Sequence, residues 1–116
     1  MRIRVVTGDI TQLAVDAIIV NLFEGVKSPG GATAAVDQAL GGIISDLIAG
    51  KQIKGKLNET RIIHTLGKIA PSMVMVVGLG KKKGLDTESI RQAAAAASKS
   101  LRSAGASHIA TIMHGA

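Results

Sequence analysis

The sequence contains no cysteine, no tryptophan and no tyrosine, and its single aromatic side chain is Phe23. Without cysteine the chain can form no disulfide, no thiolate metal site and no cysteine nucleophile. Because 47% of the residues are nevertheless hydrophobic, the core must be built from Ile, Val, Leu and Ala. Such a core favours flat, close layers of helix on sheet. The scarcity of aromatics also removes the stacking platforms on which single-stranded nucleic acid binds.

Long hydrophobic runs are also missing. The longest apolar stretches, such as residues 73–77, are far too short to cross a bilayer. The N-terminus has no basic segment followed by an apolar one, as a signal peptide would have. We therefore expect a cytoplasmic protein with no membrane partner. The length of 116 residues suits one compact domain.

Positive charge exceeds negative charge, and the excess is uneven. The formal net charge is +6, and residues 59–116 hold eight Lys and Arg against three acids, a net of +5. Such an excess attracts phosphate, nucleic acid or an acidic protein surface. The simpler interpretation is a solvated face whose compensating acids lie in a missing remainder of the protein.

Hydropathy patterns predict five strands and two helices. Residues 16–21 and 73–77 are continuous apolar runs, typical of strands covered on both faces. The order β-β-α-β-β-α-β predicts an α/β fold in which a mixed, largely parallel sheet lies between helix layers, giving three layers. The predicted strands are residues 2–7, 16–21, 60–65, 73–77 and 108–113.

Capping residues and glycines mark the predicted helix ends. Thr33 is expected to cap a first helix that continues to Leu47 and is interrupted by Gly41-Gly42. Asp86 is a good N-cap for the last helix, and Gly105 stands where a left-handed C-cap belongs. The apolar stripe expected to face the sheet on that helix consists of Ile90, Ala94, Ala97, Leu101 and Ala104.

Two glycine-rich segments follow predicted strands. Pro29–Thr33 precedes a helix, so its backbone N–H groups could bind an anion, although a tight turn without a ligand needs the same glycines. Gly78–Gly84 lies where ligands sit in open α/β sheets, but it matches neither a dinucleotide nor a P-loop fingerprint. Within it, Lys81–Lys83 either pair with phosphate or are simply solvated.

No constellation for catalysis or metal binding is apparent. No acid stands at metal-ligand spacing from His64, His108 or His114, so we predict no metal, no cofactor and no catalytic residue in this chain. Spacing alone supports no Ser-His-Asp set. Asp9 directly follows a predicted strand, where a carboxylate either contacts a base or an amine, or stabilises its own turn.

Six segments of the chain form a recognisable pattern in the order Gly8–Gly25, Pro29–Thr33, Val36–Gly42, Thr65–Ile69, Val74–Lys81 and Leu85–Ala97. Together they resemble the start of the leucyl (cytosol) aminopeptidase family. The resemblance covers nearly the whole chain, and the combined order is specific although each piece is ordinary.

This resemblance implies that residues 1–116 are a single, non-catalytic, macro-domain-like N-terminal domain. In the family, such a domain packs beside a larger C-terminal domain that binds two divalent metal ions, Zn or Mn, and removes N-terminal residues from peptides. It also contributes to the assembly of sister subunits into a hexamer. The metal ligands and catalytic residues lie in the C-terminal half, so none is carried onto this sequence. The stop directly after a strand, at His114–Ala116, agrees with a fragment that lacks the catalytic domain.

The macro-domain likeness raises a rival interpretation. Gly8–Thr11 and Val15–Ile18 look like the opening of ADP-ribose-binding macro domains. Those domains usually carry an Asn-Ala-Ala-Asn-like segment after the second strand, where this chain has Asn21-Leu-Phe-Glu24. A bulky Phe and an acid therefore stand where an anionic ligand would approach. The nucleotide site predicted from this likeness, interpreted as vestigial, comprises Asp9, Asn21, Gly30, Gly31, Gly78 and Gly80.

Within that site the likeness gives each residue a role. Asp9 would contact adenine, and the glycines would wrap the ribose and phosphates. A third interpretation is a nucleic-acid-binding accessory domain, which the basic second half favours, since some members of the aminopeptidase family are also known as DNA-binding proteins.

Overall fold

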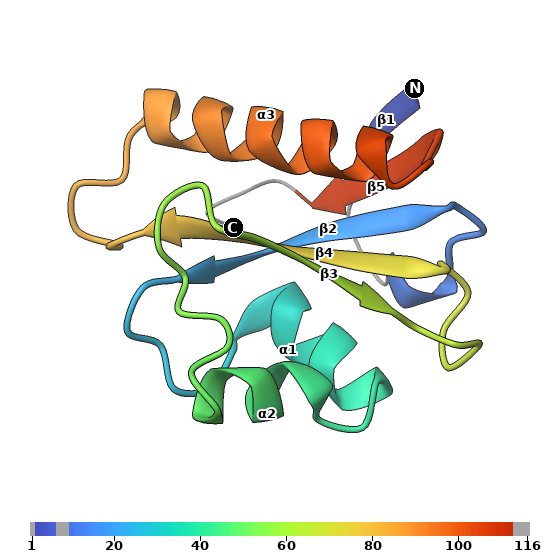
Figure 1. The fold of residues 1–116 in the computed structure, drawn as a ribbon, viewed down its shortest axis with the longest axis horizontal. Coiled ribbons are helices and arrows are strands. Elements are labelled where there is room, and N and C mark those ends of the chain that lie inside the picture. The colour runs from blue at the N-terminus through green and yellow to red at the C-terminus, as the bar shows by residue number, and fades with distance from the viewer. Residues whose placement is uncertain (1, 7–9, 113–116) are drawn as a thin grey trace.

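The computed structural model describes residues 2–6 and 10–112, which form a sheet between two helical layers (Figure 1). The five strands lie in the order β1-β5-β2-β4-β3, and all neighbours are parallel except β3, which runs antiparallel to β4. The α/β prediction with a mixed, largely parallel sheet is therefore confirmed. The strands are β1 (Arg2–Val6), β2 (Ala17–Phe23), β3 (Thr60–His64), β4 (Met73–Gly80) and β5 (His108–Ile112).

The helices cover opposite faces of the sheet, with α3 (Thr87–Ser103) on one face and α1 (Gly31–Ala39) and α2 (Ile43–Ala49) on the other (Figure 1). A short 3-10 helix, η1 (Ile10–Gln12), precedes β2. Among the helices that the structure describes, none has both the length and the apolar character needed to cross a bilayer.

Two apolar cores lie on the two faces of the sheet. Successive side chains of β2 point to opposite faces of the sheet, so Ile18 packs in the core on the α1–α2 side and Ile19 packs in the core beneath α3. Ala93 and Ala97 are both fully buried against the sheet, and their small side chains let α3 lie close to it. This is the close helix-on-sheet layering that a core of aliphatic residues and alanine predicts.

The stripe predicted for α3 is partly wrong. Ala93, Ala97 and Leu101 face the sheet at intervals of four, whereas Ala94 is only half-buried and Ala104 is exposed. Ala104 lies beyond the last helical turn, as the C-cap residue, so it has no face toward the core. The two predicted end signals are confirmed: the Asp86 side chain accepts from the Ser89 amide at 2.8 Å, and Gly105 has a φ of +89°.

The single helix predicted after Pro29 is in fact two. Gly41 and Gly42 have φ values of +74° and +88°, in the left-handed region, so the chain turns between α1 and α2. The prediction that Thr33 caps the first helix is wrong, because Gly30 is the N-cap residue. The buried Thr33 hydroxyl instead donates to the Asn21 carbonyl oxygen at 2.7 Å and ties α1 to β2.

Asp37 supplies the cap that α2 would otherwise lack. The N-cap residue of α2, Gly42, has no side chain to accept the exposed N–H groups of the first turn. Asp37, only 8% exposed, accepts from both the backbone amide and the hydroxyl of Ser45 in that turn. One buried carboxylate of α1 therefore caps the first turn of α2.

Candidate functional site

Ligands of open α/β sheets bind outside the carboxyl ends of the strands. Strands β2 and β4 end at the same edge, on the left in Figure 1, and the connecting segments 24–30, 50–59 and 81–86 gather around it. We call this region the carboxyl edge. All the glycines predicted to form a site lie in or beside it.

A pocket of about 330 Å³ opens at the carboxyl edge between the end of β2 and the start of α1. Asn21, Gly30 and Gly31 line it, so the structure brings these three predicted site residues together. Phe23 lines it as well, and the Lys82 ammonium lies 5.9 Å from the centroid of that ring, within the range of a cation–π contact. The aromatic side chain thus stands beside the glycines, as the sequence suggests.

Gly78 and Gly80 do not line that pocket, because another segment of the chain covers them. The Gly78 amide donates to the Glu59 carbonyl oxygen at 2.7 Å, and the Gly80 amide donates to the Gly55 carbonyl oxygen at 2.9 Å. Both glycines are part of β4, so the prediction of a loop at 78–80 is wrong. Their N–H groups are engaged within the protein and are not directed toward a phosphate.

The reason for glycine at position 78 is close packing of backbone on backbone. A Cβ atom there would lie 1.9 Å from the Lys56 carbonyl oxygen. Gly78 therefore lets the segment of residues 55–58 cross the end of β4 at contact distance. Nothing in the local sequence predicts this contact, since the two segments are far apart in the chain.

Asp9 and His114 lie outside the described residues, so the contact predicted between Asp9 and adenine stays a prediction. Among residues 2–6 and 10–112, no three His, Asp or Glu side chains lie close enough together to hold a metal ion. His64 is an exposed residue of β3, and His108 begins β5.

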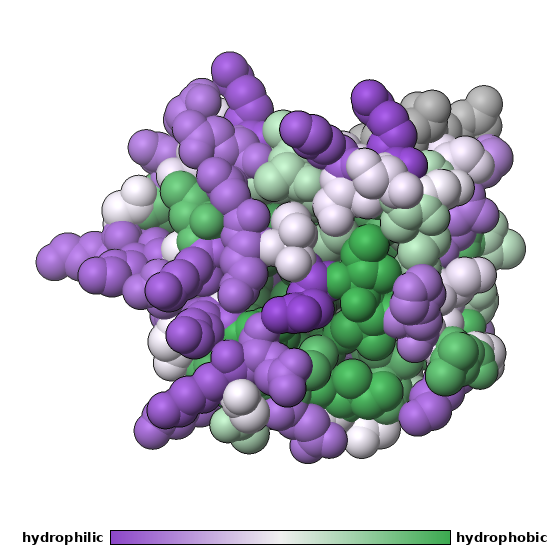
Figure 2. Space-filling model, viewed as in Figure 1, coloured by the Kyte–Doolittle hydropathy of each residue, from purple (hydrophilic) through white to green (hydrophobic). Residues whose placement is uncertain are grey.

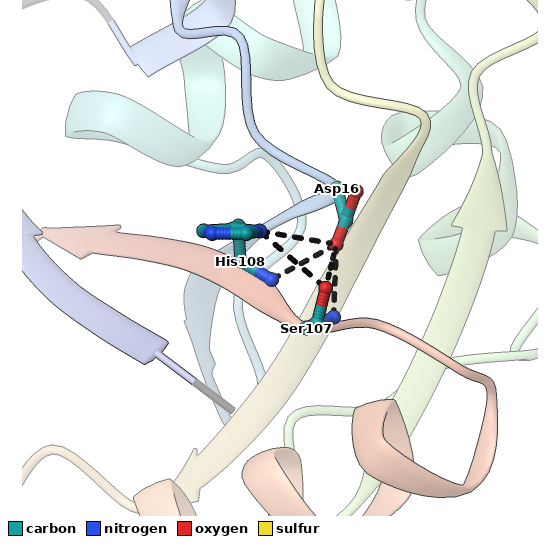
Figure 3. Close-up of polar contacts among 3 residues, drawn as sticks. All are labelled: Asp16, Ser107 and His108. Carbon is teal, nitrogen blue, oxygen red and sulfur yellow. Dashed lines mark hydrogen bonds and ion pairs between the residues drawn. The ribbon is translucent and has the colours of Figure 1, made fainter.

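A polar cluster that sequence reasoning missed lies at the opposite edge, where β2 and β5 begin (Figure 3). Asp16 Oδ2 accepts from the Ser107 amide at 2.8 Å, the Ser107 hydroxyl at 2.9 Å and the His108 amide at 2.9 Å. These hydrogen bonds, that from the His108 amide foremost, lower the pKa of Asp16 from 3.8 to about 2.

This cluster is unsuited to serine catalysis. The Ser107 hydroxyl donates to the Asp16 carboxylate, and the His108 Nδ1 atom lies 3.4 Å from the Ser107 hydroxyl oxygen. The His108 side chain is 60% exposed, so the cluster is open to solvent. Because the Ser107 hydroxyl donates to Asp16, the His108 ring is not placed to accept that proton as a general base. Asp16 therefore joins the start of β5 to β2 across 91 residues of sequence, a separation that hides the pairing from sequence inspection.

Comparison with protein families identifies relatives of this chain. The model of the cytosol aminopeptidase family, N-terminal domain, matches residues 19–115. A probable cytosol aminopeptidase of Alkaliphilus metalliredigens is 34% identical over 110 residues, which are 95% of this chain and 22% of that protein. Another, of Geobacter sp. strain M21, is 36% identical over 97% of this chain and 23% of its own length. The chain thus spans about a fifth of the length of these curated relatives.

Two solved structures share the fold. The macrodomain of Mycobacterium tuberculosis DarG superimposes with a TM-score of 0.72 at 12% identity, covering 95% of this chain and 74% of that one. A mutant of tomato leucine aminopeptidase gives a TM-score of 0.69 at 18% identity, covering 97% of this chain and 23% of that one. At such low identities the likeness concerns the fold alone, which is macro-domain-like.

Proposed function

The chain belongs to the cytosol aminopeptidase family as its N-terminal domain, and from this premise we propose that its role is structural rather than catalytic. Residues 1–116 form one domain that packs beside its own C-terminal catalytic domain, and the full-length enzyme removes N-terminal amino acids from peptides in the cytoplasm. The domain also supports the assembly of sister subunits into a hexamer. The observation that carries this proposal is the match of residues 19–115 to a family model defined for the N-terminal domain.

In this proposal the two divalent metal ions, Zn or Mn, belong to the catalytic domain. No residue of this chain is assigned to them, since the part that the structure describes offers no cluster of three His, Asp or Glu ligands. In this proposal the chain provides a surface, formed by a sheet with helices on both faces, on which neighbouring domains and subunits can pack.

The proposal is tested with leucine p-nitroanilide in the presence of manganese or zinc. The isolated 116-residue chain should release p-nitroaniline no faster than a buffer blank. A full-length curated relative, assayed under the same conditions, is the positive control. Turnover well above the blank, retained after further purification, would contradict a non-catalytic role.

For the nucleotide alternative, we propose that the site at the carboxyl edge is vestigial. Asn21, Gly30 and Gly31 still line one pocket, which favours a small ligand, but Phe23 and Glu24 line the same pocket. The engaged amides of Gly78 and Gly80 support this proposal as well, because phosphate binding by a glycine loop needs free N–H groups.

Titration calorimetry with ADP-ribose tests this vestigial site. No heat of binding is expected at millimolar ligand. The Phe23→Ala variant, which removes the aromatic side chain from the pocket, is measured for comparison. Saturable heat with the unmodified chain would favour the binding module over a vestigial site.

Nucleic-acid binding by the basic second half is the third candidate. The observation in its favour is that Lys81, Lys82 and Lys83 are all exposed at the carboxyl edge. A gel shift at low salt is the test, since phosphate contacts are strongest there. A shift that weakens steeply with added salt would support this candidate, and no shift at low salt would count against it.

A further inference from the structure

Three pockets meet around Glu24 at the carboxyl edge, and lysines line each of them. The first, of about 360 Å³, lies between the segment after β2 and the end of α2. The second is the pocket of about 330 Å³ beside Phe23, and the third, of about 320 Å³, lies beside the end of β4. The seven lysines that line them, here called the lysine edge, are Lys27, Lys51, Lys54, Lys56, Lys81, Lys82 and Lys83.

Acidic side chains do not neutralise the lysine edge. Among the described residues, none of these lysines has a carboxylate oxygen within 4.0 Å, and the ion pairs found involve Arg91 and His108. Two acids of the connecting segments are committed to backbone N–H groups: Glu59 accepts from residues 54 and 55, and Asp86 caps α3. Glu24 is the one acid among the residues that line the three pockets, so seven lysines outnumber a single carboxylate and the net charge of the lining is positive.

Apolar side chains lie between the lysines. Val26, Ile48 and Ile53 line the first pocket, while Leu57, which is 41% exposed, and Leu85 line the third. Figure 2 shows hydrophilic side chains projecting on the side where β2 and β4 end, with hydrophobic atoms between them. The surface therefore offers both charge and apolar contact to a ligand.

We propose that the lysine edge binds an acidic segment of polypeptide that also carries aliphatic side chains. Carboxylates of the segment would pair with the lysines, and its aliphatic groups would occupy the apolar parts of the pockets. Phosphate-backbone recognition fits less well. A phosphate backbone could pair with the lysines, but it presents no aliphatic group to Val26, Ile48 and Leu57, which lie between them. The single aromatic side chain, Phe23, is already in contact with Lys82.

Fluorescence anisotropy with a labelled peptide of Glu-Glu-Leu repeats tests this proposal on the 116-residue chain. The peptide should bind at low ionic strength and be released as salt is added, since exposed charges are screened beyond ~10 Å at 0.1 M salt. A peptide of Gln-Gln-Leu repeats should not bind. Failure of the acidic peptide to bind at low ionic strength would overturn the proposal.

Substitutions locate the binding surface. Lys51→Gln, Lys54→Gln and Lys56→Gln should each weaken binding about two- to fivefold, and the triple variant roughly tenfold or more. Lys68→Gln and Lys99→Gln are the matched controls, because both lysines are exposed but line none of the three pockets. An equal loss in the control variants would contradict the location. Tighter binding of duplex DNA than of the acidic peptide would instead assign the lysine edge to nucleic acid.

Discussion

Two buried polar side chains, Thr33 and Asp37, join neighbouring elements of this domain. Thr33 joins α1 to β2 through the Asn21 carbonyl, and Asp37 joins α1 to α2 through Ser45. Neither role is visible in the sequence, where Thr33 resembles a helix cap and Asp37 an ordinary helix-surface acid. Their burial distinguishes them, because a polar group removed from water must find a partner within the protein.

Substituting Asp37 tests the cap of α2. Asp37→Ala leaves the Ser45 amide and hydroxyl without their acceptor, so we expect the free energy of unfolding to fall by about 1–3 kcal/mol. Urea denaturation followed by circular dichroism measures the change. Gln38→Ala, at an exposed position of the same helix, should alter the free energy by less than about 0.5 kcal/mol. Equal stability of the two variants would contradict the capping role.

The Asp16 cluster predicts a pH dependence of stability. The pKa of Asp16 is about 2 in the folded chain, below the ordinary 3.8, so folding favours its ionised form. The stabilisation is fully present above pH 3.8 and is lost as the pH falls toward about 2. The free energy of unfolding should therefore exceed that of Asp16→Asn at neutral pH, and the difference should shrink through this window. A difference that is constant across the window would contradict the assignment.

At the scale of elements, local patterns predict most of the architecture. The buried strands, the cap at Asp86 and the stop at Gly105 all follow from neighbouring residues, and each is confirmed. The two errors have different causes. The split between α1 and α2 is local, because Gly41 and Gly42 adopt left-handed φ values and turn the chain where the sequence indicates only an interruption. The extension of β4 through Gly80 depends on pairing with Gly55 and Glu59, which lie far away in the sequence, and local propensity carries no information about such pairing.

Of the residues predicted to form the candidate site, some come together in the structure and others do not. Asn21, Gly30 and Gly31 converge because one short connection joins the end of β2 to the start of α1. Gly78 and Gly80 follow a strand in a pattern typical of ligand loops, but the segment of residues 55–58 occupies the space beside them. Only the tertiary structure distinguishes a glycine that lines a pocket from a glycine that packs against another part of the chain.

Gly78→Ala tests whether this crossing depends on glycine. The new Cβ atom would lie 1.9 Å from the Lys56 carbonyl oxygen, which forces the backbone segments apart, and we expect a loss of about 1–3 kcal/mol. Thermal and urea denaturation measure it. Gly30→Ala is the matched control, since a Cβ there meets nothing within 4 Å, and it should cost less than about 1 kcal/mol. Full stability of Gly78→Ala would contradict the close packing.

At the scale of the whole molecule, fold and family give complementary information. The macro-domain-like fold is shared with proteins of different kinds, so it does not by itself assign a function. Family membership rests on the match over residues 19–115. Together they identify a macro-domain-like N-terminal domain of this family, in which residues 55–58 occupy the space beside Gly78 and Gly80.

We propose that this domain serves a catalytic domain encoded in the same polypeptide. Sequencing the gene through and beyond the codon for Ala116 tests it most directly. We predict an open reading frame that continues into a second domain, to which we assign the two divalent metal ions. A stop codon directly after that of Ala116, with no such domain encoded in frame, would contradict the claim.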